Sequence, residues 1–475
     1  MSIQSGEMKL KWDARVVAAK QWGTVEQVLL GCADRAGLAV LESYCGHEIY
    51  GRYSFVTFDP VTTLRCNEQD DIDPFDALDD PLSRYGIDCG EEGLPFIGGW
   101  VGYLAYEAGR FLERLPQQTQ RDLDLPFACF GLYDTLGVFD HLHERWHVAG
   151  VELPTEFAPH RPKLAERLDH MESLITAAAD QPAPVVAIQP TPRFDVLRNH
   201  DEYVRGVRRI LEYIRAGDIY QANLTTRFGI PMSSNSIDLY RSLRQHNPAD
   251  YMAYLDCGDH QVLCSSPELF LRVAGDQVLT RPIKGTRARV GDAAEDRAVM
   301  AELLASEKDL AELAMIVDLE RNDIGRVCDE VSADWPPMVE TYTTVHHLVA
   351  DVRGRIGESN RNTEGWVPHA ESVIDILRAT FPGGSITGAP KIRAMEIIDE
   401  LETVARGPYC GAIGYIGFDG RMAMNIAIRT MIVKDGQAYV HAGSGIVADS
   451  DPESEYRETM AKAKGMLAAL GVDPK

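Results

Sequence analysis

A cluster of prolines near the middle of the chain limits the possible folds most. Four prolines fall between residues 182 and 192. Proline has no backbone N–H and a fixed φ, so such a stretch forms neither a helix nor a central strand. We therefore interpret residues 181–195 as a Pro-rich linker. It divides the 475-residue chain into an N-terminal region, residues 1–180, and a C-terminal region, residues 196–475.

Both regions mix apolar strand-like runs with amphipathic helices. After the linker, Val204, Val207, Leu211 and Ile214 recur at helical spacing, and Gly217 follows them as the expected C-cap. Other helical patterns are KDLAELAMIVDLE and APKIRAMEIIDELE. Strand-like runs are YSFVTF, CFGLYDTLGVFD, YMAYLD, QVLCSS and AYVHAG. This mixture predicts an α+β or α/β fold.

Charge and cysteine content exclude some classes of protein. The chain has 47 Lys+Arg against 72 Asp+Glu, a formal net charge of -25. An acidic field repels phosphate backbones, so we expect no nucleic-acid partner, and any anion site must be locally basic or hold a metal. The 9 cysteines form no CxxC pair, which favours reduced thiols in a cytoplasmic protein. No signal-like N-terminus and no apolar run near the ~20 residues of a membrane span are present, so we expect no membrane contact.

A lysine stands in an unusual place in the stretch RPIKGTRARVG, residues 281–291. The pattern predicts a strand that leads into a tight turn, with Lys284 between apolar residues and a glycine. Lysine is rarely buried without a partner. Two interpretations therefore remain open: a solvated lysine at a strand end, or an amine held in a pocket to react.

Two helical patterns each carry a pair of acids. Asp309 and Glu312 are three residues apart, as are Glu455 and Glu458, so each pair lies on one helix face. Acidic first turns are favoured by the helix dipole, and two solvated turns are one interpretation. The pairs also suit Mg²⁺, which prefers carboxylates, waters and a substrate oxygen. The sequence alone cannot bring the two helices together.

Glycines and one arginine suggest anion binding. Gly383, Gly384 and Gly388 precede an expected helix that opens at Ala389, which resembles an anion-binding helix N-terminus but lacks the P-loop spacing. A turn that only packs is the alternative.

A second group of this kind lies nearer the C-terminus. The backbone N–H groups of Gly443 and Gly445, at a strand end, are candidates to meet a carboxylate. Arg429 lies in the apolar run NIAIRTMIV, where a guanidinium needs an anionic partner.

Taken together, these stretches resemble the chorismate-utilising enzymes. This family includes component I of aminodeoxychorismate synthase and of anthranilate synthase, and the isochorismate and salicylate synthases. The resemblance implies two large antiparallel β-sheets packed as a sandwich with helices outside. The N-terminal half matches more weakly, through VLESYCG and GRYSFVTFDP, which resemble the family's regulatory half. The main matches occur in order between about residues 208 and 465: GDIYQANLTTRF, SSPELFL, RPIKGTRAR, AELAMIVDLERNDIGRV, VHHLVADVRG, FPGGSITGAPKIRAMEIIDELE, YCGAIGYIGFDG, NIAIRTMIV and AGSGIVADSDPESEYRET.

Three positions favour one branch of the family. Aminodeoxychorismate synthases resemble this chain in PIKGTR, at Lys284, and in FPGGSITGAPK, whereas anthranilate synthases resemble PIAGTR and FPAGTLSGAPK. Isochorismate and salicylate synthases place a lysine where this chain has Gln221, which argues against water as the nucleophile. We therefore predict conversion of chorismate and ammonia to 4-amino-4-deoxychorismate, for 4-aminobenzoate and folate synthesis. Anthranilate synthase component I and a catalytically silent regulatory partner are the alternatives.

The resemblance implies catalytic roles for three residues. Lys284, as a neutral amine, attacks C2 of the ring and expels the C4 hydroxyl, after which ammonia attacks C4 and expels the lysine. Glu268, in SSPELF, matches the general acid/base, which requires a raised pKa. His347 matches the family's active-site histidine better than His346 does, and a structural histidine is the alternative.

The resemblance also implies binding roles. Arg429, Gly443 and Gly445, with Tyr409 beside them, take the enolpyruvyl carboxylate. Gln221 lies on the substrate side, and the glycine loop contacts the ring carboxylate through Gly384 and Thr387. Mg²⁺ is the implied cofactor. Its ligands are Glu312 and Glu458, with Asp309 and Glu455 direct or through water; much of the family has Glu in place of Asp309, and the shorter arm favours a water.

A partner and a regulatory ligand complete these expectations. The chain has no G-x-C-x-G glutaminase motif, so a separate glutamine amidotransferase subunit is expected to supply ammonia. The N-terminal half is a candidate for a tryptophan pocket, with a purely structural role as the alternative. Its candidate residues are Glu42, Ser43, Asn247, Pro248, Tyr251 and Met252.

Overall fold

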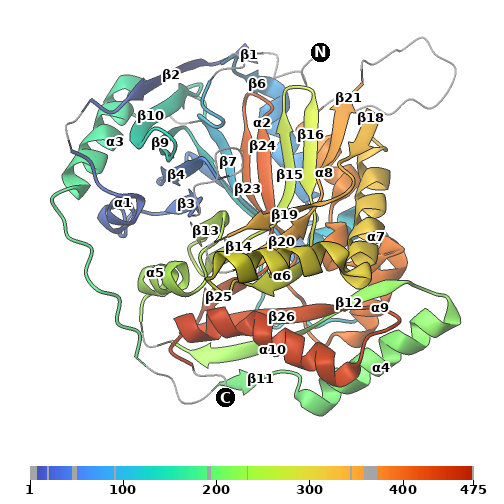
Figure 1. Ribbon diagram of the computed structural model, residues 1–475. Helices are drawn as coiled ribbons and strands as arrows, with labels where there is room; N and C mark the ends of the chain where they lie inside the picture. The colour runs from blue at the N-terminus through green and yellow to red at the C-terminus, as the bar shows by residue number, and fades with distance from the viewer. Residues whose placement is uncertain are drawn as a thin grey trace, which may run out of the picture.

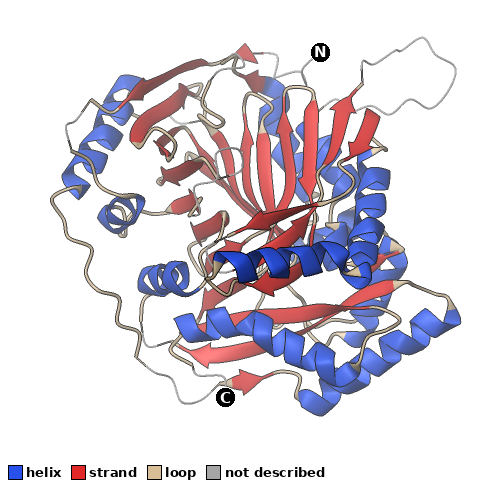
Figure 2. Cartoon of the chain, in the orientation of Figure 1, coloured by secondary structure: helices blue, strands red, loops and turns tan. Residues whose placement is uncertain are grey.

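Two large antiparallel β-sheets face each other across an apolar core, with helices on the outside (Figure 1 and Figure 2). This arrangement confirms the expected sandwich. The computed structural model describes nine ranges of the chain: 8–18, 21–44, 51–89, 93–157, 159–189, 194–232, 234–342, 345–357 and 372–472.

The first sheet has 12 strands among the described residues, and neighbouring strands are antiparallel throughout. In spatial order the strands are β11 (Asp195–Val196), β12 (Gln221–Pro231), β26 (Gln437–Ile446), β25 (Thr430–Lys434), β14 (Gln261–Ser266), β13 (Tyr251–Asp256), β3 (Ala39–Glu42), β4 (Tyr53–Thr57), β9 (Thr135–Asp140), β10 (Arg145–Glu152) and β2 (Lys11–Val16), with β22 (Gly388–Ala389) paired to β12.

The second sheet has 9 strands in the described part of the chain: β18 (Cys328–Ala333), β21 (Val352–Ile356), β16 (Gln277–Arg281), β15 (Leu269–Ala274), β24 (Met422–Ile426), β23 (Ala412–Gly417), β7 (Gly99–Leu104), β8 (Ala128–Tyr133) and β5 (Thr62–Cys66). Smaller sheets consist of β17 (Ile283–Ala288), β20 (Val345–Val349) and β19 (Met338–Thr341), and of β1 (Met8–Lys9) with β6 (Tyr85–Gly86).

The Pro-rich segment does not separate two cores. Residues 182–189, the part of it that is described before residue 194, contain neither helix nor strand. Strands from both sides of the segment nevertheless pair within each large sheet: β3 pairs with β13, and β7 pairs with β23. The two halves of the chain therefore share one continuous apolar interior between the sheets.

The helices cover the outer surfaces of the sheets. On the 12-stranded sheet lie α1 (Val25–Gly31), α3 (Leu164–Ala178), α4 (His200–Ala216), α5 (Ser236–His246), α9 (Lys391–Leu401) and α10 (Pro452–Ala469). Near the 9-stranded sheet lie α2 (Pro74–Arg84), α7 (Glu307–Ile324) and α8 (Val373–Thr380), and α6 (Ala293–Ala305) packs on the 3-stranded sheet. In the described ranges the 3₁₀ turns are η1 (Glu68–Asp70), η2 (Tyr106–Phe111) and η3 (Gly384–Ile386).

Helix α4 illustrates why the sequence forms these elements. An Asn199 capping box opens it, and Gly217, at φ 83°, closes it in the left-handed region that favours glycine. Val204, Val207 and Leu211 are buried on one face, as the spacing predicted. No helix in the described ranges is long and apolar enough to cross a membrane. All 8 cysteines that the structure describes are free thiols.

Candidate active site

A cavity of about 710 Å³, here called the main cavity, lies where the 12-stranded sheet, the 3-stranded sheet and helices α7 and α10 meet. Its walls bring together residues that are far apart in the sequence. The expected site residues among its lining are Glu268, Lys284, Asp309, Glu312, His347, Tyr409, Arg429, Gly443, Gly445, Glu455 and Glu458.

Lys284 reaches the main cavity because its strand is irregular. The register of β17 against β20 shifts between Lys284 and Thr286. Gly285 between them has φ 64°, and a Cβ atom there would lie 2.8 Å from Leu303 Cδ1. Only glycine fits this bulge, which re-aims the neighbouring side chain. Lys284 Nζ donates a hydrogen bond to the Ser385 carbonyl oxygen at 3.3 Å.

The surroundings of Lys284 favour its neutral form. Burial lowers the pKa of this amine, and the nearby Lys462 lowers it further. The carboxyls of Glu268, Glu312 and Glu320 act in the opposite direction but do not restore the ordinary value. A lysine of lowered pKa presents a lone pair that can attack carbon.

Glu268 lies in the turn between β14 and β15 and is held by its backbone. Its N–H donates to Ser266 Oγ at 3.1 Å, and its carbonyl oxygen accepts from the N–H of Ile426 at 3.0 Å. Burial raises the pKa of the carboxyl, although Lys284 nearby lowers it in part. A raised pKa favours the protonated carboxyl, which is the form that can protonate a leaving hydroxyl.

The alternation of strand β20 separates the two histidines. His347 faces the main cavity and hydrogen-bonds through Nδ1 to Thr286 Oγ1 at 2.9 Å. His346 points to the other side, where its Nδ1 lies 2.9 Å from Thr341 Oγ1. Burial, Arg429 and His346 lower the pKa of His347 to about 3, so its imidazole is neutral.

Arg429 lies in the connection from β24 to β25 with φ 51°, a region that residues other than glycine rarely adopt. Its Nη1 makes a long hydrogen bond, 3.5 Å, to Asn247 Oδ1. Among the described residues it forms no ion pair, and burial lowers its pKa. A buried guanidinium without an ion pair requires an anion, and its two parallel N–H groups match the two oxygens of a carboxylate.

The floor of the main cavity near Arg429 is formed by glycine backbone. Gly443 and Gly445 of β26 pair with Thr225 and Asn223 of β12. A Cβ atom at Gly443 would lie 2.4 Å from the carbonyl oxygen of Leu224, so a side chain does not fit. Backbone atoms are thereby left accessible on this wall.

The four acids approach the main cavity from opposite helices. Asp309 and Glu312 come from α7, and Glu455 and Glu458 come from α10. Burial raises the pKa of Glu312, and the like charges of Asp309 and Glu458 raise it further. The positive charge of Lys284 lowers this pKa in part. Burial alone would also raise the pKa of Glu458, but Lys462 and other lysines lower it overall.

The acids have partial partners within the chain. Asp309 accepts from Arg287 at 2.9 Å, and Glu458 pairs with Lys462 at 2.7 Å. Ser450 donates to Glu455 Oε1 at 2.6 Å, whereas Glu455 Oε2 is buried without a hydrogen-bond partner in the described part of the chain.

In the described ranges, no group of three or more His, Cys, Asp or Glu side chains lies close enough together to hold a metal ion as it stands. The four acids nevertheless have the chemistry that suits a hard cation, because their carboxylates repel one another and Glu455 Oε2 has no hydrogen-bond partner among the described residues.

The glycine loop contributes different residues from those expected. Ser385 and Ile386 line the main cavity, whereas Gly384 and Thr387 are absent from its described lining. The Thr387 hydroxyl donates back to the carbonyl oxygen of Gly383 at 3.0 Å. The Thr387 hydroxyl is therefore used in a hydrogen bond within its own turn.

Three residues near this loop, Gly384, Lys391 and Gln221, are absent from the described lining of the main cavity. At Gly384 a Cβ atom would lie 2.7 Å from Leu319 Cδ2, so this glycine is required for packing against α7. The first residue of α9, Lys391, pairs with Asp323 instead of opening onto the main cavity. Gln221 is buried beneath Gly445, where its Nε2 would lie 2.8 Å from an added Cβ atom.

Sequence reasoning missed further residues of the lining: Thr225, Ser385, His441 and Lys462. Strand alternation on β12 and β26 is a signal that could have found Thr225 and His441, because they share a face with Asn223 and Gly443.

A second cavity of about 200 Å³ lies between the two large sheets. Glu42, Ser43, Tyr251 and Met252 line it, Asn247 lines the main cavity instead, and Pro248 is in the described lining of neither. Glu42 is fixed by two hydrogen bonds from Arg244, at 2.7 and 2.8 Å.

Comparison with known proteins identifies the family. The model of the chorismate binding enzyme family matches residues 41–468. Anthranilate synthase component 1 of Thermus thermophilus is 41% identical over 425 residues, 88% of this chain and 87% of that protein. Aminodeoxychorismate synthase component 1 of Bacillus subtilis is 36% identical over 440 residues, 88% of this chain and 89% of that protein.

A solved structure gives the same result. The crystal structure of anthranilate synthase component I from Streptococcus pneumoniae aligns with a TM-score of 0.75 and 34% identity, over 88% of this chain and 93% of that one. The chain therefore belongs to the family of chorismate-binding enzymes.

Proposed function

We propose that this chain is the aminating component of an aminodeoxychorismate synthase, which converts chorismate and ammonia to 4-amino-4-deoxychorismate. Relatives from the anthranilate and aminodeoxychorismate branches have similar identity, so overall similarity does not choose between them. The observation that carries the proposal is Lys284, an amine of lowered pKa on the wall of the main cavity beside the buried acid Glu268.

The first half of the reaction joins the lysine to the substrate. The lone pair of Lys284 Nζ forms a bond to C2 of the ring. The ring double bonds shift, and the C4–O bond breaks. Glu268 gives its proton to the departing hydroxyl, which leaves as water, and Glu268 becomes a carboxylate. Burial of this carboxyl supports the role because it raises the pKa and so favours the protonated form.

The second half exchanges the lysine for nitrogen. The lone pair of ammonia forms a bond to C4, the double bonds shift back, and the bond from C2 to Lys284 breaks with its electron pair returning to Nζ. The new C4 ammonium gives one proton to the Glu268 carboxylate, which restores the starting enzyme. Two displacements through a covalent intermediate replace one difficult displacement.

The other expected residues hold the substrate. Arg429, with no ion-pair partner in the described residues, takes the enolpyruvyl carboxylate beside the backbone of Gly443 and Gly445. Tyr409 also lines the main cavity. His347 is neutral and offers a hydrogen bond without charge. Glu312 and Glu458, with Asp309 and Glu455, would hold Mg²⁺, which would supply a positive charge for the ring carboxylate.

Ammonia requires a source. We propose that a separate glutamine amidotransferase subunit supplies it, as expected from the lack of a glutaminase motif in this chain.

Product analysis tests the function directly. Purified protein is incubated with chorismate, an ammonium salt and Mg²⁺, and the products are separated and identified by mass. The proposal predicts 4-amino-4-deoxychorismate, which retains the enolpyruvyl group, and no free pyruvate. Anthranilate with an equivalent of pyruvate would assign the chain to the other branch, and no turnover with Mg²⁺ present would support a silent regulatory partner.

The second cavity supports a separate proposal, that tryptophan binds there. It combines the apolar Phe55 and Tyr415 with the polar Ser43, and Glu42 of its wall is held by an ion pair. The measurement is a thermal shift with L-tryptophan and with D-tryptophan as the control. Equal shifts with both enantiomers, or none with either, would count against a specific site.

A further inference from the structure

His441 is a buried polar side chain that the proposed reaction leaves without a role. It lies in the middle of β26 with 2% of its surface exposed. Neither ring nitrogen has a hydrogen-bond partner among the described residues. A buried donor or acceptor without a partner is costly, and native structures contain few of them. Such a group in a cavity wall indicates that something else meets it.

The position of His441 in the sheet relates it to the site. It lies two residues before Gly443 on β26, so both face the main cavity, about 7 Å apart along the strand. Its ring stacks on that of Tyr409, with centroids 5.0 Å apart and planes at 17°. Stacking fixes the plane of the imidazole against this wall.

Glu455, one of the four acids, lies beyond Gly443 on the side away from His441. Strand β26 ends at Ile446, and the chain then passes Ser450, which bonds Glu455, into α10. In chorismate the ring carboxylate is para to C4. If the acids hold the carboxylate end, then C4 is directed away from them, toward the end of the main cavity that His441 borders.

The charges around His441 keep the imidazole neutral. Burial lowers its pKa well below the ordinary value, and Arg227 and Arg406 lower it further. Both arginines are already paired: Arg227 with Asp122 at 2.9 Å, and Arg406 with Glu402 at 2.8 Å. A neutral ring offers one N–H donor and one acceptor nitrogen.

Thr225, which lines the same cavity on the facing strand β12, is satisfied within the chain. The N–H and the hydroxyl of Thr225 both donate to Glu402 Oε1, at 3.0 and 2.8 Å. The two ring nitrogens of His441, by contrast, stay unused by the described residues. They suit a small neutral molecule that both donates and accepts hydrogen bonds better than a carboxylate, which only accepts.

We propose that His441 holds the neutral ammonia that attacks C4, at the end of the main cavity opposite the carboxylate cluster. The inference rests on the proposed aminating function. The acceptor nitrogen of the imidazole takes a hydrogen bond from an ammonia N–H, which leaves the ammonia lone pair directed at C4. The imidazole neither gains nor loses a proton, because the proton released from the new ammonium goes to Glu268.

Two matched variants test the proposal. His441→Phe keeps an aromatic ring against Tyr409 and removes both nitrogens, whereas His441→Gln restores a donor and an acceptor. With ammonium salt as nitrogen donor, we expect the KM for ammonia to rise about three- to tenfold in His441→Phe, as for the loss of one hydrogen bond. The KM for chorismate should stay within about twofold, and His441→Gln should return toward the wild type.

A partial reaction separates this role from a structural one. Without ammonia, the chorismate adduct on Lys284 should form in His441→Phe at the wild-type rate, because only the second displacement needs ammonia. Mass spectrometry of quenched protein follows the adduct. If His441→Phe does not fold, His441→Met removes the same nitrogens and is measured in its place.

The outcomes are distinct. A raised KM for chorismate with an unchanged KM for ammonia would overturn the proposal in favour of a substrate contact. Unchanged KM values for both ammonia and chorismate would overturn the proposal and assign His441 a purely structural role. Failure of the proposed function appears elsewhere, in the product that the wild type makes from chorismate and ammonium salt. If the wild type makes anthranilate, nitrogen is added at C2 instead of C4, and the placement of ammonia at C4 fails together with the proposed function.

Discussion

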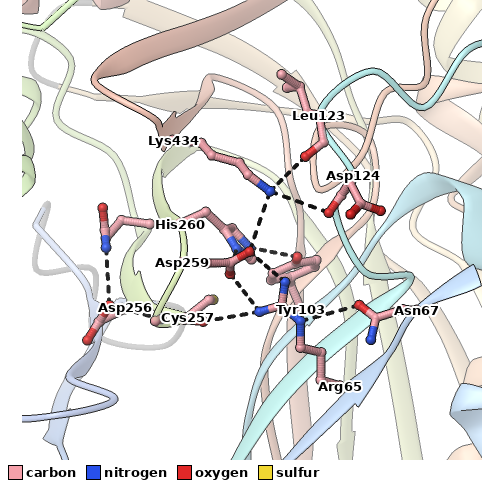
Figure 3. Close-up of polar contacts among 12 residues, drawn as sticks. Arg65, Asn67, Tyr103, Leu123, Asp124, Asp256, Cys257, Asp259, His260 and Lys434 are labelled. Carbon is pink, nitrogen blue, oxygen red and sulfur yellow. Dashed lines mark hydrogen bonds and ion pairs between the residues drawn. The ribbon is translucent and has the colours of Figure 1, made fainter. Parts of the chain in front are cut away.

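Two polar clusters in this molecule differ in how their charges are matched. Figure 3 shows the first, here called the Arg65 network, which links strands from both halves of the chain. Arg65 of β5 donates to Asp259 at 2.6 and 2.7 Å. Asp259 also accepts from His260 at 2.8 Å and from Lys434 at 3.4 Å. Tyr103 bonds the other nitrogen of His260 at 2.9 Å.

The main cavity lacks this internal matching. Arg429 makes only a long hydrogen bond to the side-chain amide of Asn247, and Lys284 donates a single hydrogen bond, to a backbone carbonyl at 3.3 Å. Glu455 Oε2 has no hydrogen-bond partner in the described part of the chain. Buried groups in this state cost stability. In the Arg65 network the charges are matched between strands, whereas the main cavity leaves charged groups unmatched, which is consistent with the proposed binding of a substrate and a cation there.

The largest expected difference comes from removing one lysine in each cluster. Lys284→Ala should lower the turnover of chorismate by about 10³-fold or more, because it removes the proposed nucleophile. Lys434→Ala is the matched control: it loses bonds to Asp259 and to the Leu123 carbonyl oxygen and should retain wild-type kinetics. Steady-state rates of both variants provide the measurement. An active Lys284→Ala enzyme would refute the covalent route.

A second prediction concerns Glu320, a buried acid on α7 that accepts from Thr280 at 2.8 Å. Burial raises its pKa to about 8. The folded state then keeps a proton that the unfolded state releases above pH ~4.5, so stability falls as pH rises from there through about 8. Glu320→Gln should remove this loss, on the order of 3 kcal/mol between pH 5 and 8.

Urea unfolding at several pH values checks this prediction. An unchanged slope of stability against pH in Glu320→Gln would show that the carboxyl is ionised in the folded protein. Asp318, an exposed acid of the same helix, gives the control variant Asp318→Asn, which should leave the slope as it is.

A third prediction addresses the anion site. Arg429→Lys keeps a positive charge but loses the fork, so we expect the KM for chorismate to rise about 10- to 30-fold with a smaller change in kcat. Because Arg429 is not paired within the described residues, unfolding stability should not fall. A loss of stability without a change in KM would place Arg429 with the structural arginines of the Arg65 network.

The smallest expected effect is in the Arg65 network. Arg65→Met should lower the free energy of unfolding by about 1–2 kcal/mol, a value between those of exposed and buried ion pairs, since the pair is partly exposed. Chorismate kinetics should not change. Denaturant unfolding and steady-state rates, measured on one preparation, test both statements, and a loss of activity at full stability would contradict the comparison.

Several elements of the fold were predictable because they depend on neighbours in the sequence. YMAYLD and QVLCSS form β13 and β14, and the helix before Gly217 forms as its spacing indicates. The run CFGLYDTLGVFD divides into β8 and β9 at Asp134, however. That acid pairs with Arg161 and Arg167, partners that no local pattern reveals.

The sequence by itself determined the chemical types of the site: the amine at Lys284, the acid at Glu268 and the paired carboxylates of two helices. Local periodicity is enough for this, because it states which residues share a face. Only the tertiary structure decided that α7 and α10 direct their acids into one cavity and that Thr387 turns back into its own loop. It also brought His441 onto Tyr409. These contacts join segments far apart in the chain, and they form only when both sheets close on a shared apolar core.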